Sequence, residues 1–225
     1  MTSKVLSLNH LYLPPRRTSA GKPPLLILLH GFGSNEQDLF GLHPYLDERF
    51  AVVSARGPLT LQPGSHAWYR VQWLADGTMH MDDAEAEAAI RAVTAFVHEA
   101  VEAYGADSAR VFIGGFSQGA IMSECVALTQ PRLVAGAVLM SGRTLDLLHR
   151  HDLQPAAGYP PMIVVHGTVD RVLSIDEGRA TQSFLQALAV DFEYREYPMA
   201  HQISDESLDE IDTWLSAHLD ASESL

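Results

Sequence analysis

A serine set between glycines, Gly115-Phe116-Ser117-Gln118-Gly119, is the pattern in this chain best suited to chemistry. The apolar run 111–113 before it is typical of a buried strand, and residues 120–128 continue with helical spacing. A serine between such a strand and helix stands on a tight, strained turn, where glycines leave room that a β-carbon would fill. We therefore predict that Ser117 is a nucleophile. The alternative is a glycine-rich connection in which the serine is incidental.

A serine hydroxyl needs a base within hydrogen-bond reach and a carboxylate that orients that base. Asp170 follows the apolar run 162–165, and His201 follows the alternating run 191–197. This gives the chain order nucleophile, acid, histidine that accompanies such a serine turn. Both residues come at the carboxyl ends of predicted strands, where their side chains can converge on Ser117. The sequence predicts Asp170 as the acid and His201 as the base.

Other histidines and acids compete for these roles. His30 and His166 also follow predicted strands, but each directly precedes a glycine, and we interpret both as bracing their loops through hydrogen bonds. The other candidates lie in polar or helix-like stretches and are interpreted as solvated side chains: Asp146, Asp152, Asp176, His149, His151 and His218.

An acyl-transfer site also needs hydrogen-bond donors for the oxyanion. The backbone N–H of Gln118 lies at the start of the helix predicted after Ser117 and is one candidate. The backbone N–H of Phe32 is the other, because glycines on both sides of Phe32 let the peptide turn inward. An ordinary turn is the alternative interpretation of Gly31 and Gly33.

Strands alternate with helices along the chain, and these elements must position the candidate residues. Strands are predicted at 25–29, 51–55, 111–113, 134–140, 162–165 and 191–197, with one or two edge strands within 4–13; helices are predicted at 82–105, 120–128, 178–188 and 208–219. Asp82 and Glu85 are expected to form a capping box. The run 25–29 is apolar on both faces, which is typical of a central parallel strand. We predict an α/β fold in a single domain, 1–225, with a mainly parallel central sheet and helices on both faces.

Composition narrows the classes of function. The 225 residues carry a formal net charge of −13, which repels phosphate backbones, so no nucleic-acid partner is expected. The single cysteine, Cys125, allows no intrachain disulfide and suits a reducing compartment. Residues 1–15 hold no apolar segment of signal-peptide length, and the run 25–29 is far too short to cross a bilayer. We expect a cytoplasmic protein with no membrane span.

Together these motifs resemble those of the phospholipase/carboxylesterase family of small α/β-hydrolases, which includes bacterial carboxylesterases and acyl-protein thioesterases. The matching residues are His30-Gly31-Phe32-Gly33, Arg56-Gly57-Pro58, Gly115-Phe116-Ser117-Gln118-Gly119, Ser141-Gly142, His166-Gly167 with Asp170 and Val172, and Pro198 with His201. The resemblance implies an α/β-hydrolase fold without a separate lid domain. It also implies ester or thioester hydrolysis by Ser117, His201 and Asp170, with Phe32 and Gln118 as oxyanion donors and with no cofactor or metal.

Two features bear on the substrate. Trp68, Tyr69 and Trp73 lie in the long connection 56–81 and could wall an acyl pocket, with core packing as the alternative. Arg143 follows Ser141-Gly142 where family members often carry an uncharged residue, and it could bind an anionic group of the substrate. The alternative is that Arg143 pairs with Asp146 or points to solvent.

The leading hypothesis is therefore a serine hydrolase that acts on a small-molecule ester or thioester through an acyl-enzyme. A noncatalytic α/β-hydrolase that only binds a ligand is the alternative. Acyl length, ester against thioester preference and the natural substrate stay open, and a homodimer is a further possibility.

Overall fold

The computed structural model describes residues 4–18, 21–73, 79–155 and 158–223. Its centre is a seven-stranded sheet with the order β1-β3-β2-β8-β9-β10-β11. Within this sheet, only the β1–β3 pair is antiparallel among the described strands. The strands are β1 (His10–Leu13), β2 (Leu25–Leu29), β3 (Ala51–Ala55), β8 (Val111–Phe116), β9 (Gly136–Met140), β10 (Met162–Gly167) and β11 (Phe192–Tyr197). The predicted mainly parallel sheet is confirmed.

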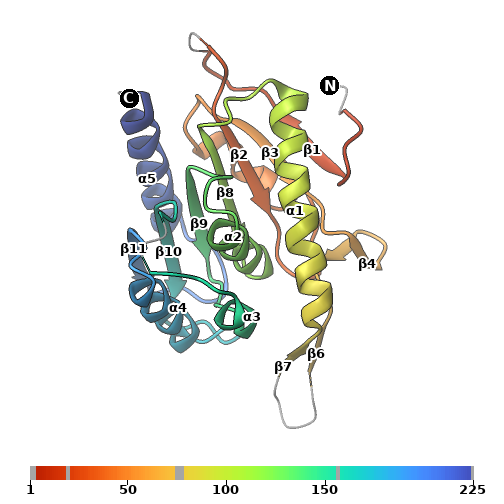
Figure 1. The fold of residues 1–225 in the computed structure, drawn as a ribbon, viewed down its shortest axis with the longest axis vertical. Coiled ribbons are helices and arrows are strands. Elements are labelled where there is room, and N and C mark those ends of the chain that lie inside the picture. The colour runs from red at the N-terminus through yellow and green to blue at the C-terminus, as the bar shows by residue number, and fades with distance from the viewer. Residues whose placement is uncertain (1–3, 19–20, 74–78, 156–157, 224–225) are drawn as a thin grey trace.

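Helices cover both faces of this sheet. On one face α1 (Asp83–Tyr104), α2 (Gln118–Thr129), α3 (Asp146–Arg150) and α4 (Ile175–Ala187) bury their apolar residues in one core cluster. On the other face the 3-10 helix η1 (Leu39–Tyr45) and α5 (Asp205–Glu223) form a second cluster. Figure 1 shows α1 and α2 in front of the strands. Every residue of β2 is buried, as expected for a strand covered on both sides.

At the start of α1, only the Asp82 part of the predicted capping box forms. The Asp82 carboxylate accepts hydrogen bonds from the N–H groups of Ala84 and Glu85, as an N-cap should. The Glu85 carboxylate does not complete the box; it accepts from the backbone N–H of Arg70 at 2.9 Å and pairs with the Arg70 guanidinium. The N-terminus of α1 is therefore tied to the connection that precedes β6.

The long connection after β3 contains more structure than expected. It folds into two hairpins, β4 (Leu59–Gln62) with β5 (Ser65–Ala67) and β6 (Val71–Trp73) with β7 (Met79–Met81). Gly64 has a φ of 77° and turns the first hairpin. Strands β6 and β7 lie beyond the N-terminal end of α1 (Figure 1). These strands of three or four residues are too short for a periodic pattern, which is why the sequence predicted only a connection.

Candidate active site

The turn between β8 and α2 has the geometry that the glycine pattern predicted. Ser117 adopts φ 54° and ψ −116°, a backbone conformation rare for a residue with a side chain. A β-carbon on Gly115 would overlap the backbone of Gly119, and one on Gly119 would overlap the carbonyl oxygen of Leu29. The Ser117 N–H donates to the carbonyl of Met140 on the neighbouring strand at 2.8 Å. The chain thus holds Ser117 at the end of β8 in a strained conformation.

Asp170 and His201 meet at the same edge of the sheet. Asp170 follows β10, His201 follows β11, and the His201 Nδ1–H donates to Asp170 Oδ2 at 2.6 Å. The second carboxylate oxygen of Asp170 accepts from the N–H groups of Val172 at 2.8 Å and Leu173 at 3.0 Å. The Asp170 side chain is fully buried, whereas the His201 side chain is 16% exposed. A carboxylate fixed in this way orients the imidazole and leaves its Nε2 free to accept a proton.

Ser117 and His201 line one cavity of about 290 Å³. Most of its wall is apolar: Phe32, Tyr69, Val71, Phe116, Ile121 and Leu173. Asp38 adds a carboxylate to the lining, and this carboxylate accepts a hydrogen bond from the Ser34 hydroxyl at 2.7 Å. The described residues that line this cavity include no lysine or arginine. The cavity therefore suits an uncharged, largely apolar ligand.

Both predicted oxyanion donors border this cavity. The N–H of Gln118 belongs to the first turn of α2, where backbone donors have no acceptor within the helix. Phe32 lies in the loop after β2 and lines the cavity beside Ser117. A β-carbon on the adjacent Gly31 would lie 3.5 Å from the Ser117 β-carbon. The loop after β2 thus packs directly against the serine turn.

The two residues suggested for substrate contact lie elsewhere. Trp68 is 1% exposed and belongs to the core, while its neighbour Tyr69 reaches the cavity. The side chain of Trp73 falls outside the described residues. Arg143 lines a different cavity of about 680 Å³, between α3 and α4. The site cavity is therefore lined by Tyr69 and Val71 from this part of the chain, and neither Trp68 nor Arg143 borders it.

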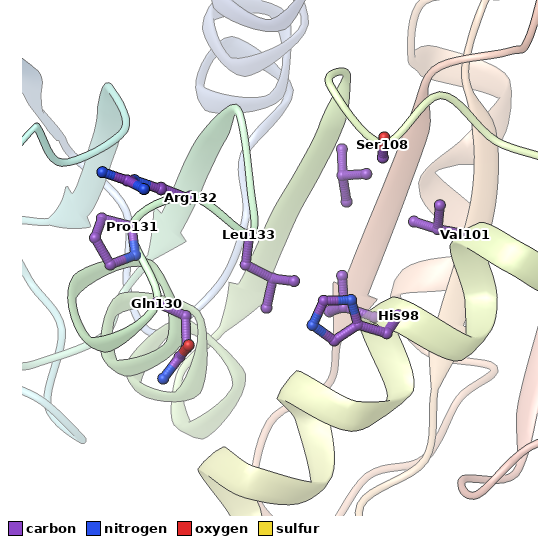
Figure 2. A pocket seen from close by; sticks show the side chains of 9 residues that line it. His98, Val101, Ser108, Gln130, Pro131, Arg132 and Leu133 are labelled. Carbon is purple, nitrogen blue, oxygen red and sulfur yellow. The ribbon is translucent and has the colours of Figure 1, made fainter.

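A further groove lies at the opposite end of β8 (Figure 2). It has a volume of about 460 Å³ between α1 and the segment that follows α2. Val111, the first residue of β8, lines it, whereas Ser117 follows the last residue of that strand. His98 extends from α1 toward Leu133 in this view. The described lining residues offer no carboxylate to orient that imidazole, so the groove lacks the elements of a hydrolytic site.

Comparison with known proteins identifies the family. Residues 17–219 match the family model described as phospholipase/carboxylesterase. The chain belongs to the phospholipase/carboxylesterase family. The predicted resemblance is thereby confirmed, and it extends over most of the chain.

Relatives within the phospholipase/carboxylesterase family carry related names. The chain is 27% identical over 222 residues to a probable carboxylesterase of Oryza sativa subsp. japonica, covering 93% of this chain and 83% of the relative. It is also 27% identical over 228 residues to acyl-protein thioesterase 1 of Neurospora crassa, covering 89% of this chain and 93% of that protein. The Bacillus cereus carboxylesterase structure superposes with a TM-score of 0.79 at 25% identity, covering 94% of each chain. The predictions of an α/β-hydrolase fold and of an enzyme of the carboxylesterase and thioesterase kind are confirmed.

Among the described residues, none of the helices has the length and apolar character that a bilayer crossing requires. Within those residues there is also no group of three or more histidine, cysteine or acidic side chains arranged to hold a metal ion.

In this member of the phospholipase/carboxylesterase family, α2 also carries a buried acid that sequence reasoning missed. Glu124 is 1% exposed, and its Oε1 accepts a hydrogen bond from the Thr144 hydroxyl at 2.7 Å. Burial raises the pKa of Glu124 to about 7. A glutamate seven residues after the serine, within an otherwise apolar helical run, was the available signal.

This acid predicts a pH-dependent stability. Between the ordinary glutamate pKa and about 7 the folded protein binds more protons than the unfolded chain, so the free energy of unfolding should fall as pH rises through that range. Glu124→Gln should flatten this slope and stabilise the protein above pH 7, by on the order of 3 kcal/mol. Urea unfolding at pH 5 and pH 8 measures both effects. The exposed Glu102→Gln is the matched control, and equal slopes in the two variants would contradict the prediction.

Proposed function

We propose that the protein hydrolyses carboxylic esters or thioesters through an acyl-enzyme on Ser117. The observation that carries the proposal is the hydrogen bond from His201 to the buried Asp170, with His201 and the strained Ser117 lining one cavity. A carboxylate, an imidazole and a serine in this arrangement are the parts of a nucleophilic acyl-transfer site.

The proposed reaction has two halves. Ser117 Oγ attacks the carbonyl carbon while its proton passes to His201 Nε2, and the backbone N–H groups of Phe32 and Gln118 stabilise the oxyanion. The tetrahedral intermediate then expels the alcohol or thiol, which takes the proton from His201. In the second half water attacks the acyl-enzyme, again with His201 as base, and releases the acid and free Ser117. Asp170 keeps the imidazole in the productive tautomer and stabilises its cationic form.

The lining of the cavity favours uncharged substrates. Its walls are mainly apolar, Asp38 adds a negative charge, and the cation suggested for anionic substrates, Arg143, borders another cavity. The net charge of −13 works in the same direction. We therefore propose neutral esters or thioesters with an apolar acyl group as the preferred class.

This preference is tested with two aryl esters of five-carbon acyl groups, a neutral pentanoate and a glutarate that carries a free carboxylate. The kcat/KM of the anionic ester should be lower by roughly tenfold, the effect of about 1.4 kcal/mol of repulsion. Asp38→Asn keeps an oxygen that can accept a hydrogen bond from Ser34. It should reduce the difference in kcat/KM between the two esters, most clearly at low salt. Faster hydrolysis of the anionic ester would contradict the proposal, and Arg143→Ala would then be the next variant to measure.

A panel of chromogenic esters and thioesters of graded acyl length tests the function as a whole. Turnover that saturates with substrate supports the proposed hydrolase. A protein that binds the panel without turnover is the noncatalytic alternative. Residence in the cytoplasm and a homodimer stay predictions, which cell fractionation and size-exclusion chromatography check.

A further inference from the structure

The side chain of Gln118 joins the serine turn to the wall of the cavity. Its Oε1 accepts a hydrogen bond from the backbone N–H of Trp68 at 2.9 Å, and its Nε2 donates to the carbonyl of Tyr69 at 2.8 Å. Gln118 is 3% exposed. One carboxamide thus pairs with backbone groups of two consecutive residues in the segment between β5 and β6. Trp68 and Tyr69 are each 1% exposed, so their backbone polar groups need partners within the protein.

Trp68 continues this connection to the loop after β2. Its indole Nε1–H donates to the carbonyl of His30 at 2.9 Å, and the two rings lie 5.4 Å apart. The His30 Nε2 in turn accepts from the N–H of Gly57 at 2.9 Å. Burial lowers the pKa of His30, which keeps its imidazole neutral and able to accept. Trp68 is therefore bound on one side to Gln118 and on the other to His30.

The two residues that Trp68 joins, Gln118 and His30, lie at or close to the candidate oxyanion donors. Gln118 itself supplies one backbone N–H, and His30 lies two residues before Phe32, which supplies the other. We propose that the Gln118 carboxamide and the Trp68 indole form a positioning bracket that sets the spacing between the two donors. This inference rests on the proposed function. Gln118 and Trp68 act here as positioning residues, because these side chains reach the reacting atoms only through the backbone.

The bracket should affect the transition state more than the bound substrate. An oxyanion forms only during the reaction. Displaced donors therefore lower kcat but leave ground-state binding of the substrate nearly unchanged. Loss of one oxyanion donor costs about 10²- to 10³-fold in kcat in other acyl-transfer enzymes. Displaced donors should cost less, and we expect a kcat reduced by roughly 10- to 100-fold with KM within a factor of about three.

The test compares two Trp→Phe variants. Trp68→Phe removes the indole N–H that holds His30 and keeps an aromatic ring in the core. Trp214→Phe is the matched control, since Trp214 is also buried but packs against Phe112 on the opposite face of the sheet. Both variants are measured for kcat and KM on a neutral short-chain ester, for affinity for an alkyl boronic acid that mimics the tetrahedral intermediate, and for thermal stability.

The bracket predicts that Trp68→Phe loses kcat whereas Trp214→Phe does not, and that the affinity of Trp68→Phe for the boronic acid falls in parallel. Gln118→Met, which removes both carboxamide hydrogen bonds, should lower the same two quantities. The double variant should lose less than the product of the single effects. The proposal is overturned if Trp68→Phe keeps its kcat, if KM alone rises, or if Trp214→Phe loses as much. Labelling of wild-type Ser117 by a fluorophosphonate separates these outcomes from a failure of the proposed function.

Discussion

Ser117→Ala is expected to lower kcat by about 10⁶-fold, because the serine, histidine and aspartate of such a site act as a unit and only the oxyanion and binding contributions survive. The fold should be retained, since alanine differs from serine only by the hydroxyl group. Initial rates at saturating ester, with enzyme concentration raised to detect residual turnover, measure the loss. Circular dichroism on the same samples checks the fold.

Ser141→Ala is the matched control for that variant. Ser141 also follows a strand, β9, has a positive φ of 49°, and is fully buried. It should keep wild-type activity within a few-fold, and a fluorophosphonate probe should label Ser117 alone. Labelling of another serine, or more than a few per cent of activity in Ser117→Ala, would refute the assignment of the nucleophile.

Asp170→Asn is expected to lower kcat by about 10⁴-fold, the cost of the corresponding change in a serine protease. An amide in place of the carboxylate can donate to His201 Nδ1, which leaves the proton on Nε2, where it blocks acceptance from Ser117. It also removes the charge that stabilises the imidazolium. Substrate binding should change little, because Asp170 is fully buried beneath His201.

Steady-state kinetics and the rate of fluorophosphonate labelling should fall together in Asp170→Asn. Asp176→Asn is the control, since its side chain lies on α4 and is 87% exposed. Wild-type rates in Asp170→Asn would mean that another acid orients His201. A large loss in Asp176→Asn would point to that residue.

Several parts of the fold could be predicted because their signals are local. The strand at 25–29 was predicted with the bounds of β2, since a run that is apolar on both faces has few alternatives in an α/β protein. The turn at Ser117 could also be predicted, because Gly115 and Gly119 stand where β-carbons would overlap backbone atoms. The nearness of Asp170 to His201 followed from topology, since parallel strands bring their carboxyl ends to one edge.

Tertiary structure alone decided where the side chains of Trp68, Arg143 and Gln118 lie. An aromatic residue in a connection can face a cavity or the core, and its sequence neighbours do not distinguish the two. Gln118 and Trp68 are 50 positions apart, and their contact exists only once the segment between β5 and β6 docks against the serine turn. Arg143 follows β9 at the expected edge, yet its side chain lies between α3 and α4. Local patterns encode burial and turn geometry, whereas the partner of a side chain depends on how distant segments pack.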